Sequence, residues 1–180
     1  DKDITRLGEP KLYWGISGGC VDSMVANYTA TKKKRRTDDF TPGGQNTKRP
    51  DRAVIVYTNL IKRFFKGSPV PIVISGIESS LRRITHYDYW SNSLRRPIVF
   101  DAKADIISYG MGEKSMLELA KALRDNKPWE DIRGLCYISK EEKHGYLKIP
   151  SFEECKKDKY KFIEAFNTFY QNCDPITAKG

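Results

Sequence analysis

Apolar residues follow two different spacings along this chain, and the two alternate. The segment KLYWGISGG contains a short, continuous apolar run from Leu12 to Ile16 that ends in a glycine turn. The residues after the turn place Val21, Met24, Val25 and Tyr28 at helical spacing. A continuous apolar run bounded by turn residues is typical of a buried strand, and the 3.6-residue spacing is typical of a helix. The segment therefore predicts a strand, a glycine turn and a helix, in that order.

The same order recurs further along the chain. Residues 51–65 predict a helix with Asp51 as its N-cap, because their apolar side chains share one helical face. Residues 72–75 predict a buried strand that ends at Gly76, and residues 106–109 predict another strand, followed by a Gly-x-Gly turn and a helix. Residues 132–140 favour a further strand, and residues 151–172 predict a C-terminal helix capped by Ser151. Because strands alternate with helices, we predict an α/β fold with a doubly wound, mostly parallel sheet.

Residues 31–50 interrupt this alternation. They are polar, contain five consecutive basic residues and include a Pro-Gly-Gly turn. Like charges repel one another, and the segment offers little apolar anchoring. We expect a long loop that is mobile or is ordered only by a partner.

Charge is unevenly distributed. The net charge is +9, and residues 1–100 hold 18 Lys and Arg against 9 Asp and Glu, whereas residues 101–180 hold 14 of each kind. The excess favours an anionic partner for the first part of the chain, such as nucleic acid or a phosphorylated ligand. No apolar run approaches the ~20 residues that cross a bilayer, and no secretory signal is visible. We therefore expect a cytoplasmic protein without a membrane partner.

The cysteines and histidines are scattered. Cys20, Cys136, Cys155 and Cys173 form neither a CxxC nor a CxxxCxxC motif, and His86 and His144 have no ligand-spaced neighbour. The spacing favours ordinary thiols over disulfides and disfavours a zinc site. We expect no metal and no cofactor in this chain itself.

Three glycine turns follow predicted strands and form the candidate ligand site. In an open parallel sheet, ligands bind at the carboxyl ends of the strands, where glycine allows close backbone approach and a following helix offers unpaired N–H groups. Tight turning alone would also explain each glycine taken separately. Three such turns together favour one shared crevice. Its candidate residues are Ser17, Gly18 and Gly19; Gly76, Glu78, Ser79 and Ser80; and Gly110, Gly112 and Glu113.

Familiar catalytic and nucleotide motifs do not fit these turns. Ser115 stands where a dinucleotide motif needs its third glycine, and no glycine loop is followed by Lys-Ser or Lys-Thr. Ser17 and Ser79 lack the spacing of a nucleophile elbow, which disfavours a Ser-His-Asp hydrolase. We assign no catalytic residue.

Residues 75–96, SGIESSLRRITHYDYWSNSLRR, are dense in functional groups. The aromatic and arginine side chains suit base stacking with phosphate contacts, and equally suit docking against another domain. A third interpretation is a crossing loop in which His86 and Asp88 form local hydrogen bonds. The rim or interface candidates are Arg82, Arg83, His86, Tyr87, Asp88, Tyr89, Trp90, Arg95 and Arg96.

Four stretches carry a resemblance to a known family: GGCVDSMVANYTATKKKRRTDDFTPGG, RPDRAVIVYTNLI, SGIESSLRRITHYDYWSNSLRR and DAKADIISYGMGE. They closely resemble the N-terminal region of the YgiQ-type family of uncharacterised radical SAM proteins. The resemblance runs through nearly all of residues 10–175, and HYDYW and the TPGG loop are highly specific. It implies an accessory domain over residues 1–150, then a C-terminal helix and the start of a linker over residues 151–180. The implied partner is a radical SAM barrel of the same full-length chain, which would contain a [4Fe–4S] cluster and SAM.

The order of elements also resembles the flavodoxin-like, cobalamin-binding domain that precedes many radical SAM barrels. Two departures limit what that resemblance implies. No Asp-x-His-x-x-Gly turn is present, so a bound cobalamin would lack its histidine ligand. The CxxxCxxC motif, whose thiolates hold the cluster, is absent, so this chain alone is not expected to be an enzyme.

We therefore expect an accessory domain of a radical SAM enzyme of unknown substrate, which shapes or covers the active site and binds a cofactor or substrate. The alternative is a non-enzymatic, basic nucleic-acid-binding α/β module. The resemblance also implies a missing strand and helix before residue 1. The Leu12–Ile16 strand would then be an exposed sheet edge, which we expect to be covered by C-terminal residues, paired with a second copy, or paired with missing residues.

Overall fold

The structure of the chain, a computed structural model, describes residues 2–174 and residue 176. It contains two compact units. Unit 1 comprises Asp1–Arg83 and Ile98–Ile138, and unit 2 comprises Ile84–Pro97 and Ser139–Gly180.

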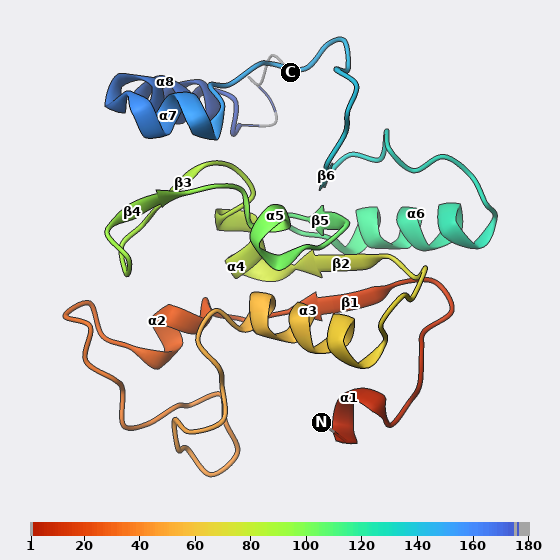
Figure 1. Ribbon diagram of the computed structural model, residues 1–180, viewed down its shortest axis with the longest axis vertical. Coiled ribbons are helices and arrows are strands. Elements are labelled where there is room, and N and C mark those ends of the chain that lie inside the picture. The colour runs from red at the N-terminus through yellow and green to blue at the C-terminus, as the bar shows by residue number, and fades with distance from the viewer. Residues whose placement is uncertain (1, 175, 177–180) are drawn as a thin grey trace. The chain divides into compact units, whose positions relative to one another are not determined.

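Unit 1 is built on a four-stranded sheet in the order β1-β2-β5-β6. The strands are β1 (Trp14–Ser17), β2 (Ile72–Ser75), β5 (Ile106–Ser108) and β6 (Leu135–Tyr137). The first three are parallel, and β6 pairs antiparallel with β5. Figure 1 shows β1 and β2 running in the same direction. The sheet is mostly parallel, which confirms the predicted α/β class and is consistent with a flavodoxin-like fold.

Helices cover both faces of this sheet. On one face, α3 (Ala53–Phe64) and α5 (Ile98–Ala102) pack over β-branched side chains that include Ile74 and Ile107. On the other face, α6 (Glu113–Arg124) places Leu119 against Val73 and Ile106. Successive residues of a strand point to opposite faces, so adjacent isoleucines and valines enter both cores. The doubly wound arrangement therefore follows from continuous apolar strands.

Several local predictions need correction. The first predicted helix is only α2 (Ser23–Asn27), and α4 (Gly76–Leu81) begins immediately after β2. The N-cap of α3 is Arg52, in a left-handed conformation, and not Asp51. The Asp51 carboxylate instead accepts hydrogen bonds from Asn27 Nδ2 (2.9 Å) and the Tyr28 hydroxyl (2.7 Å). Asp51 therefore makes tertiary hydrogen bonds instead of capping α3.

Strand β1 lies at the edge of the sheet, since among the described residues it pairs only with β2. The short helix α1 (Lys2–Thr5) lies close to it. Residues of α1 and the following turn line a hollow of about 350 Å³ together with β1 residues. Ile4 packs against the core cluster that includes Ile16. The predicted edge position of this strand is confirmed, and what covers the edge in the full-length protein stays a prediction.

The loop between α2 and α3 is held by buried polar groups. Asn46 Nδ2 donates to the Asn27 carbonyl (3.1 Å) and to the Arg35 carbonyl (3.0 Å). The buried Asp38 pairs with Arg49 at 3.0 Å. Hydrogen bonds therefore supply the anchoring that apolar side chains do not. This corrects the expectation that only a partner could order the loop.

In its described residues, unit 2 contains a hairpin and two helices. Strands β3 (His86–Asp88) and β4 (Ser93–Arg95) are antiparallel. The predicted C-terminal helix is divided into α7 (Phe152–Lys157) and α8 (Lys159–Gln171). Ser151 caps α7 in a reciprocal pair with Glu154, and Asp158 caps α8. The Ser151 cap is confirmed, and the break arises because Asp158 begins a second helix. No helix within the described residues is long and apolar enough to cross a membrane.

Candidate functional site at the carboxyl edge of the sheet

The three glycine turns follow β1, β2 and β5, which are parallel, so all three lie at one edge of the sheet. We call this the carboxyl edge. In Figure 1, α2 follows β1 and α4 follows β2 at this edge. The register sets Ser17 opposite Ser75. All ten predicted ligand-site residues, from Ser17 to Glu113, therefore gather on unit 1 as the parallel topology requires.

The first two turns are in direct contact. Gly76 has φ +81°, and a Cβ there would lie 2.7 Å from Ser17 Oγ. A Cβ on Gly18 would lie 2.6 Å from Glu78 Oε2. Ser17 Oγ itself accepts the Gly19 N–H at 3.1 Å. Glycine is required at position 76 both for the positive φ and because there is no room for a side chain. At position 18 it is required because there is no room for a side chain.

The Glu78 carboxylate joins these turns to two helices. It is 2 % exposed and accepts the Ser23 N–H at 3.0 Å and the Val54 N–H at 3.3 Å. The first N–H groups of a helix have no intrahelical acceptor, and the N-cap of α3 makes no side-chain cap bond. Glu78 and Ser23 Oγ, which accepts the Ala53 N–H at 3.0 Å, supply those acceptors. Glu78 was predicted to face the crevice; the structure shows a buried carboxylate that holds α2, α3 and α4 together.

A partly buried ion pair lies beside Glu78. Asp22 caps α2, accepting the Met24 N–H at 2.9 Å, and pairs with Arg82. Arg82 also donates to the Glu78 carbonyl at 3.2 Å. Arg82 was predicted as a rim residue and lies instead within this polar cluster. Asp22 was missed by the sequence reasoning, although an Asp just before an apolar helical pattern is a recognisable N-cap signal.

The third turn meets the second through Ser80. Its Oγ accepts the Gly110 N–H at 3.1 Å. The neighbouring Arg83 guanidinium lies over the Tyr109 ring, 4.5 Å from its centroid. Ser79 is fully buried, and its hydroxyl has no hydrogen-bond partner among the described residues. The three turns therefore form one continuous edge, with Ser80 as the link to the third.

A hollow opens next to the third turn. Its volume is about 630 Å³, and we call it the α6 hollow. Both charge signs occur in its wall, through Lys114, Glu118, Asp131 and Arg133. The other lining residues are Tyr109, Met111, Ser115, Pro128, Ile132 and Gly134. Its volume lies within the range of small-molecule sites, and its wall offers charged and aromatic groups at the edge where ligands bind in such sheets.

The remaining rim candidates belong to unit 2. His86, Tyr87, Asp88, Tyr89, Trp90, Arg95 and Arg96 lie on or beside the β3–β4 hairpin. The buried Asp88 accepts the Ser91 N–H at 3.2 Å, and His86 Nδ1 lies 3.0 Å from the Ile84 carbonyl. The predicted local hydrogen bonds of His86 and Asp88 are confirmed. That HYDYW folds over the crevice stays a prediction.

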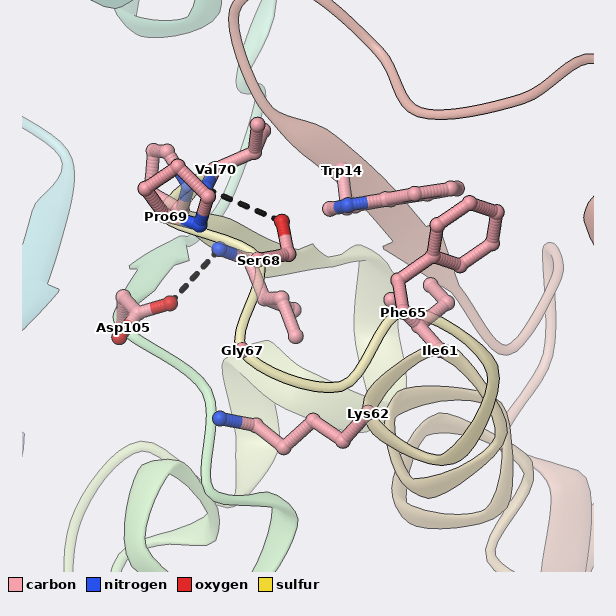
Figure 2. A pocket seen from close by; sticks show the side chains of 11 residues that line it. Trp14, Ile61, Lys62, Phe65, Gly67, Ser68, Pro69, Val70 and Asp105 are labelled. Atoms are coloured by element: carbon pink, nitrogen blue, oxygen red, sulfur yellow. Dashed lines mark hydrogen bonds between the residues drawn. The ribbon is translucent and has the colours of Figure 1, made fainter.

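A further pocket lies at the opposite, amino edge of the sheet. Figure 2 shows Trp14 and Phe65 on one side of it and Ser68–Val70 with Asp105 on the other. Its volume is about 520 Å³, and the two rings have centroids 4.7 Å apart. Asp105 Oδ2 accepts the N–H of Ile72, the first residue of β2, at 2.8 Å, so this carboxylate holds the amino end of that strand. The pocket was not predicted, and none of the glycine turns lines it.

The four thiols are divided between the two units, with Cys20 and Cys136 in unit 1 and Cys155 and Cys173 in unit 2. Cys20 and Cys173 are exposed, Cys155 is buried, and Cys136 is half-buried. Burial raises the pKa of the Cys136 thiol, against an opposing effect of the Arg83 charge. Burial also raises the pKa of the Cys155 thiol. Among residues 2–174 and 176, no three His, Cys, Asp or Glu side chains come together as a metal-ligand group.

A family model described as "Radical SAM N-terminal" matches residues 1–180. The chain belongs to this family. A UPF0313 protein of Fusobacterium nucleatum is 73% identical over 178 residues, covering 99% of this chain and 31% of the relative. UPF0313 proteins of Thermotoga petrophila and Clostridium botulinum strain Okra are 51% and 48% identical, covering 97% and 99% of this chain. The match covers 31% and 28% of these two relatives, so the chain spans about 30% of the length of the relatives it matches. No solved structure matches it.

Proposed function

We propose that this chain is the N-terminal accessory domain of a YgiQ-type radical SAM enzyme, with residues 1–150 as the domain and residues 151–180 as the helices α7 and α8 and the start of a linker. The enzyme's [4Fe–4S] cluster and SAM would be held by the remainder of the full-length chain. The carboxyl edge would contribute to the binding of a substrate or cofactor. The observation that carries this proposal is the contact of three glycine turns beside the α6 hollow, in a chain that belongs to the Radical SAM N-terminal family.

The residues present do not fit a [4Fe–4S] cluster. Such a cluster needs at least three thiolates on one centre, whereas each unit has only two cysteines and the sequence has no CxxxCxxC spacing. We therefore place no step of the radical chemistry on this chain. Its contribution would be to bind, orient and exclude water.

A histidine-ligated cobalamin does not fit either. His86 belongs to unit 2, and its Nδ1 lies 3.0 Å from the Ile84 carbonyl. His144 is outside any Asp-x-His-x-x-Gly turn. A cobalamin-binding-like role would have to proceed without a histidine ligand. We derive no function from that cofactor.

The test compares two lysines of α6 in the full-length protein. Lys114 lines the α6 hollow, whereas Lys121 is exposed in the last turn of the same helix and does not line it. After anaerobic reconstitution with iron and sulfide, we expect Lys114→Glu to lower the rate of 5′-deoxyadenosine formation from SAM several-fold. Lys121→Glu should leave the rate unchanged, and both should keep their iron content. Equal rates for the two variants would contradict a role for the carboxyl edge.

One observation favours a second candidate, nucleic-acid binding. The basic run Lys32–Arg36 is exposed, and the loop that presents it is fixed by buried hydrogen bonds. A labelled single-stranded RNA would then bind with a log–log salt slope of about −0.7 for each phosphate contact, and replacement of Lys32–Lys34 by glutamine would flatten that slope. A salt-independent affinity, or an unchanged slope in the variant, would exclude this candidate.

A further inference from the structure

Helix α8 (Lys159–Gln171) carries apolar side chains on two faces. The inner face includes Ala165, which is buried, and half-buried Phe162 and Phe169. This helix packs against α7, the other helix of unit 2. An amphipathic surface helix normally needs only one such face.

The second apolar face is exposed. Tyr160, Ile163, Phe166 and Tyr170 are 68%, 49%, 55% and 70% exposed. Their spacings of three, three and four residues place them along one side of the helix. The rings of Phe166 and Tyr170 stack with centroids 6.0 Å apart. We call these four residues the α8 stripe.

The α8 stripe has the composition of a protein interface. Aromatic side chains are enriched at interface centres, and charged residues surround them at the rim. Lys161 and Glu164 form an ion pair of 2.8 Å on the same helix, outside the stripe. Scattered exposed apolar residues are ordinary, but four adjacent ones on a single helix form a patch that a soluble protein normally covers.

The length of the relatives indicates what covers it. The chain spans 31% of the relatives from Fusobacterium and Thermotoga, and its family model is described as N-terminal. In a full-length protein of that length, most of the polypeptide would follow residue 180. Helix α8 is the last helix of the described chain, so that polypeptide would begin next to the stripe.

We propose that the α8 stripe is the docking surface for the part of the full-length chain that follows residue 180. This inference rests on the proposed function, because the docked part is the one assigned to the radical chemistry. It adds the surface through which the two parts meet. Burial of the aromatic side chains of the α8 stripe would hold unit 2 against the downstream domain.

Hydroxyl-radical footprinting of the full-length protein tests this directly. Tyr146 is 66% exposed and lies outside the stripe, so it is a matched control for Tyr160 and Tyr170. We expect Tyr160 and Tyr170 to be oxidised several-fold more slowly than Tyr146. Phe166→Glu should restore their oxidation, whereas Leu117→Glu, at an exposed site on α6, should not. Equal rates for the three tyrosines would overturn the proposal.

A photo-crosslinker at position 166 identifies the occupant. Crosslinks to peptides after residue 180 of the same chain support the proposal, and crosslinks to a second copy or to residues 1–138 overturn it. Iron content and SAM cleavage are measured on the same sample. If the protein contains a cluster and cleaves SAM but the α8 stripe is unprotected, only the docking surface is refuted. If the protein contains no cluster and does not cleave SAM, the proposed function is refuted.

Discussion

Replacing Glu78 by glutamine should destabilise unit 1 far more than its single-atom change suggests. The two carboxylate oxygens accept the Ser23 and Val54 N–H groups at 3.0 and 3.3 Å, and the side chain is almost completely buried. A glutamine has only one oxygen, so its amide NH₂ would face one of these donors. An orphaned buried donor costs about 1–3 kcal/mol, and the remaining bond loses its charge assistance, so the total loss is about 2–4 kcal/mol. This loss is a large part of the free energy of unfolding of a typical domain, which is roughly 5–15 kcal/mol.

The assay is urea unfolding of the 180-residue chain, followed by tryptophan fluorescence and linear extrapolation. The matched control is Glu113→Gln, an exposed glutamate in the first turn of α6, where the loss should stay below about 1 kcal/mol. A Glu78→Gln variant within about 0.5 kcal/mol of wild type would refute the reasoning. In that case α2 and α3 would begin without help from the turn after β2.

Three further predictions concern other parts of the chain. Gly76→Ala should lower the free energy of unfolding in urea by about 1–2 kcal/mol more than Gly110→Ala. Both glycines have positive φ, but only a Cβ at position 76 would meet another atom, Ser17 Oγ at 2.7 Å. Equal losses of stability would show that Ser17 moves freely. The pKa of Asp38 lies below its ordinary value of 3.8, chiefly because its carboxylate accepts a hydrogen bond from the Thr41 hydroxyl. The Phe40 N–H and the charge of Arg49 lower this pKa further, whereas burial acts to raise it. The stabilising contribution of Asp38 should therefore be present at neutral pH and vanish as the pH falls below 3.8, so Asp38→Asn should lose stability at neutral pH and match wild type in strong acid; a constant difference at all pH values would contradict this. Because burial raises the pKa of Cys136, iodoacetamide at neutral pH should label it more slowly than the exposed Cys20 and Cys173, as read by peptide mass spectrometry, and equal labelling would show that the thiol is accessible.

The sequence predicts the sheet better than the connections around it. The run Ile72–Ser75 begins with three β-branched residues and is bounded by proline and glycine, and it forms β2 with those bounds. Parallel pairing then brings the three glycine turns to one edge, so the membership of the candidate site follows from topology alone. The hairpin at residues 86–95 was missed because its turn has no Asn-Gly or Asp-Gly signal, and its register depends on bonds such as that from Ser91 to Asp88.

The roles within the site could not be predicted from local patterns. Glu78 lies in the first turn of a short helix, and nothing in its neighbourhood indicates that it binds N–H groups 55 and 24 residues away. Asp51 shows the converse, since its sequence position suits an N-cap while Asn27 and Tyr28 compete for its carboxylate. Both outcomes are set by tertiary contacts, which override single-residue preferences at the ends of helices.

The central claim is that this chain is an accessory domain whose own side chains do not hold the cluster of the full-length enzyme. The direct measurement is the iron and sulfide content of the anaerobically purified full-length protein, with Cys20, Cys136, Cys155 and Cys173 all intact or all replaced by alanine. The account predicts the composition of a [4Fe–4S] cluster, and SAM cleavage on reduction, in both proteins. Loss of the cluster from the alanine variant, or its absence from the unaltered protein, would contradict the account.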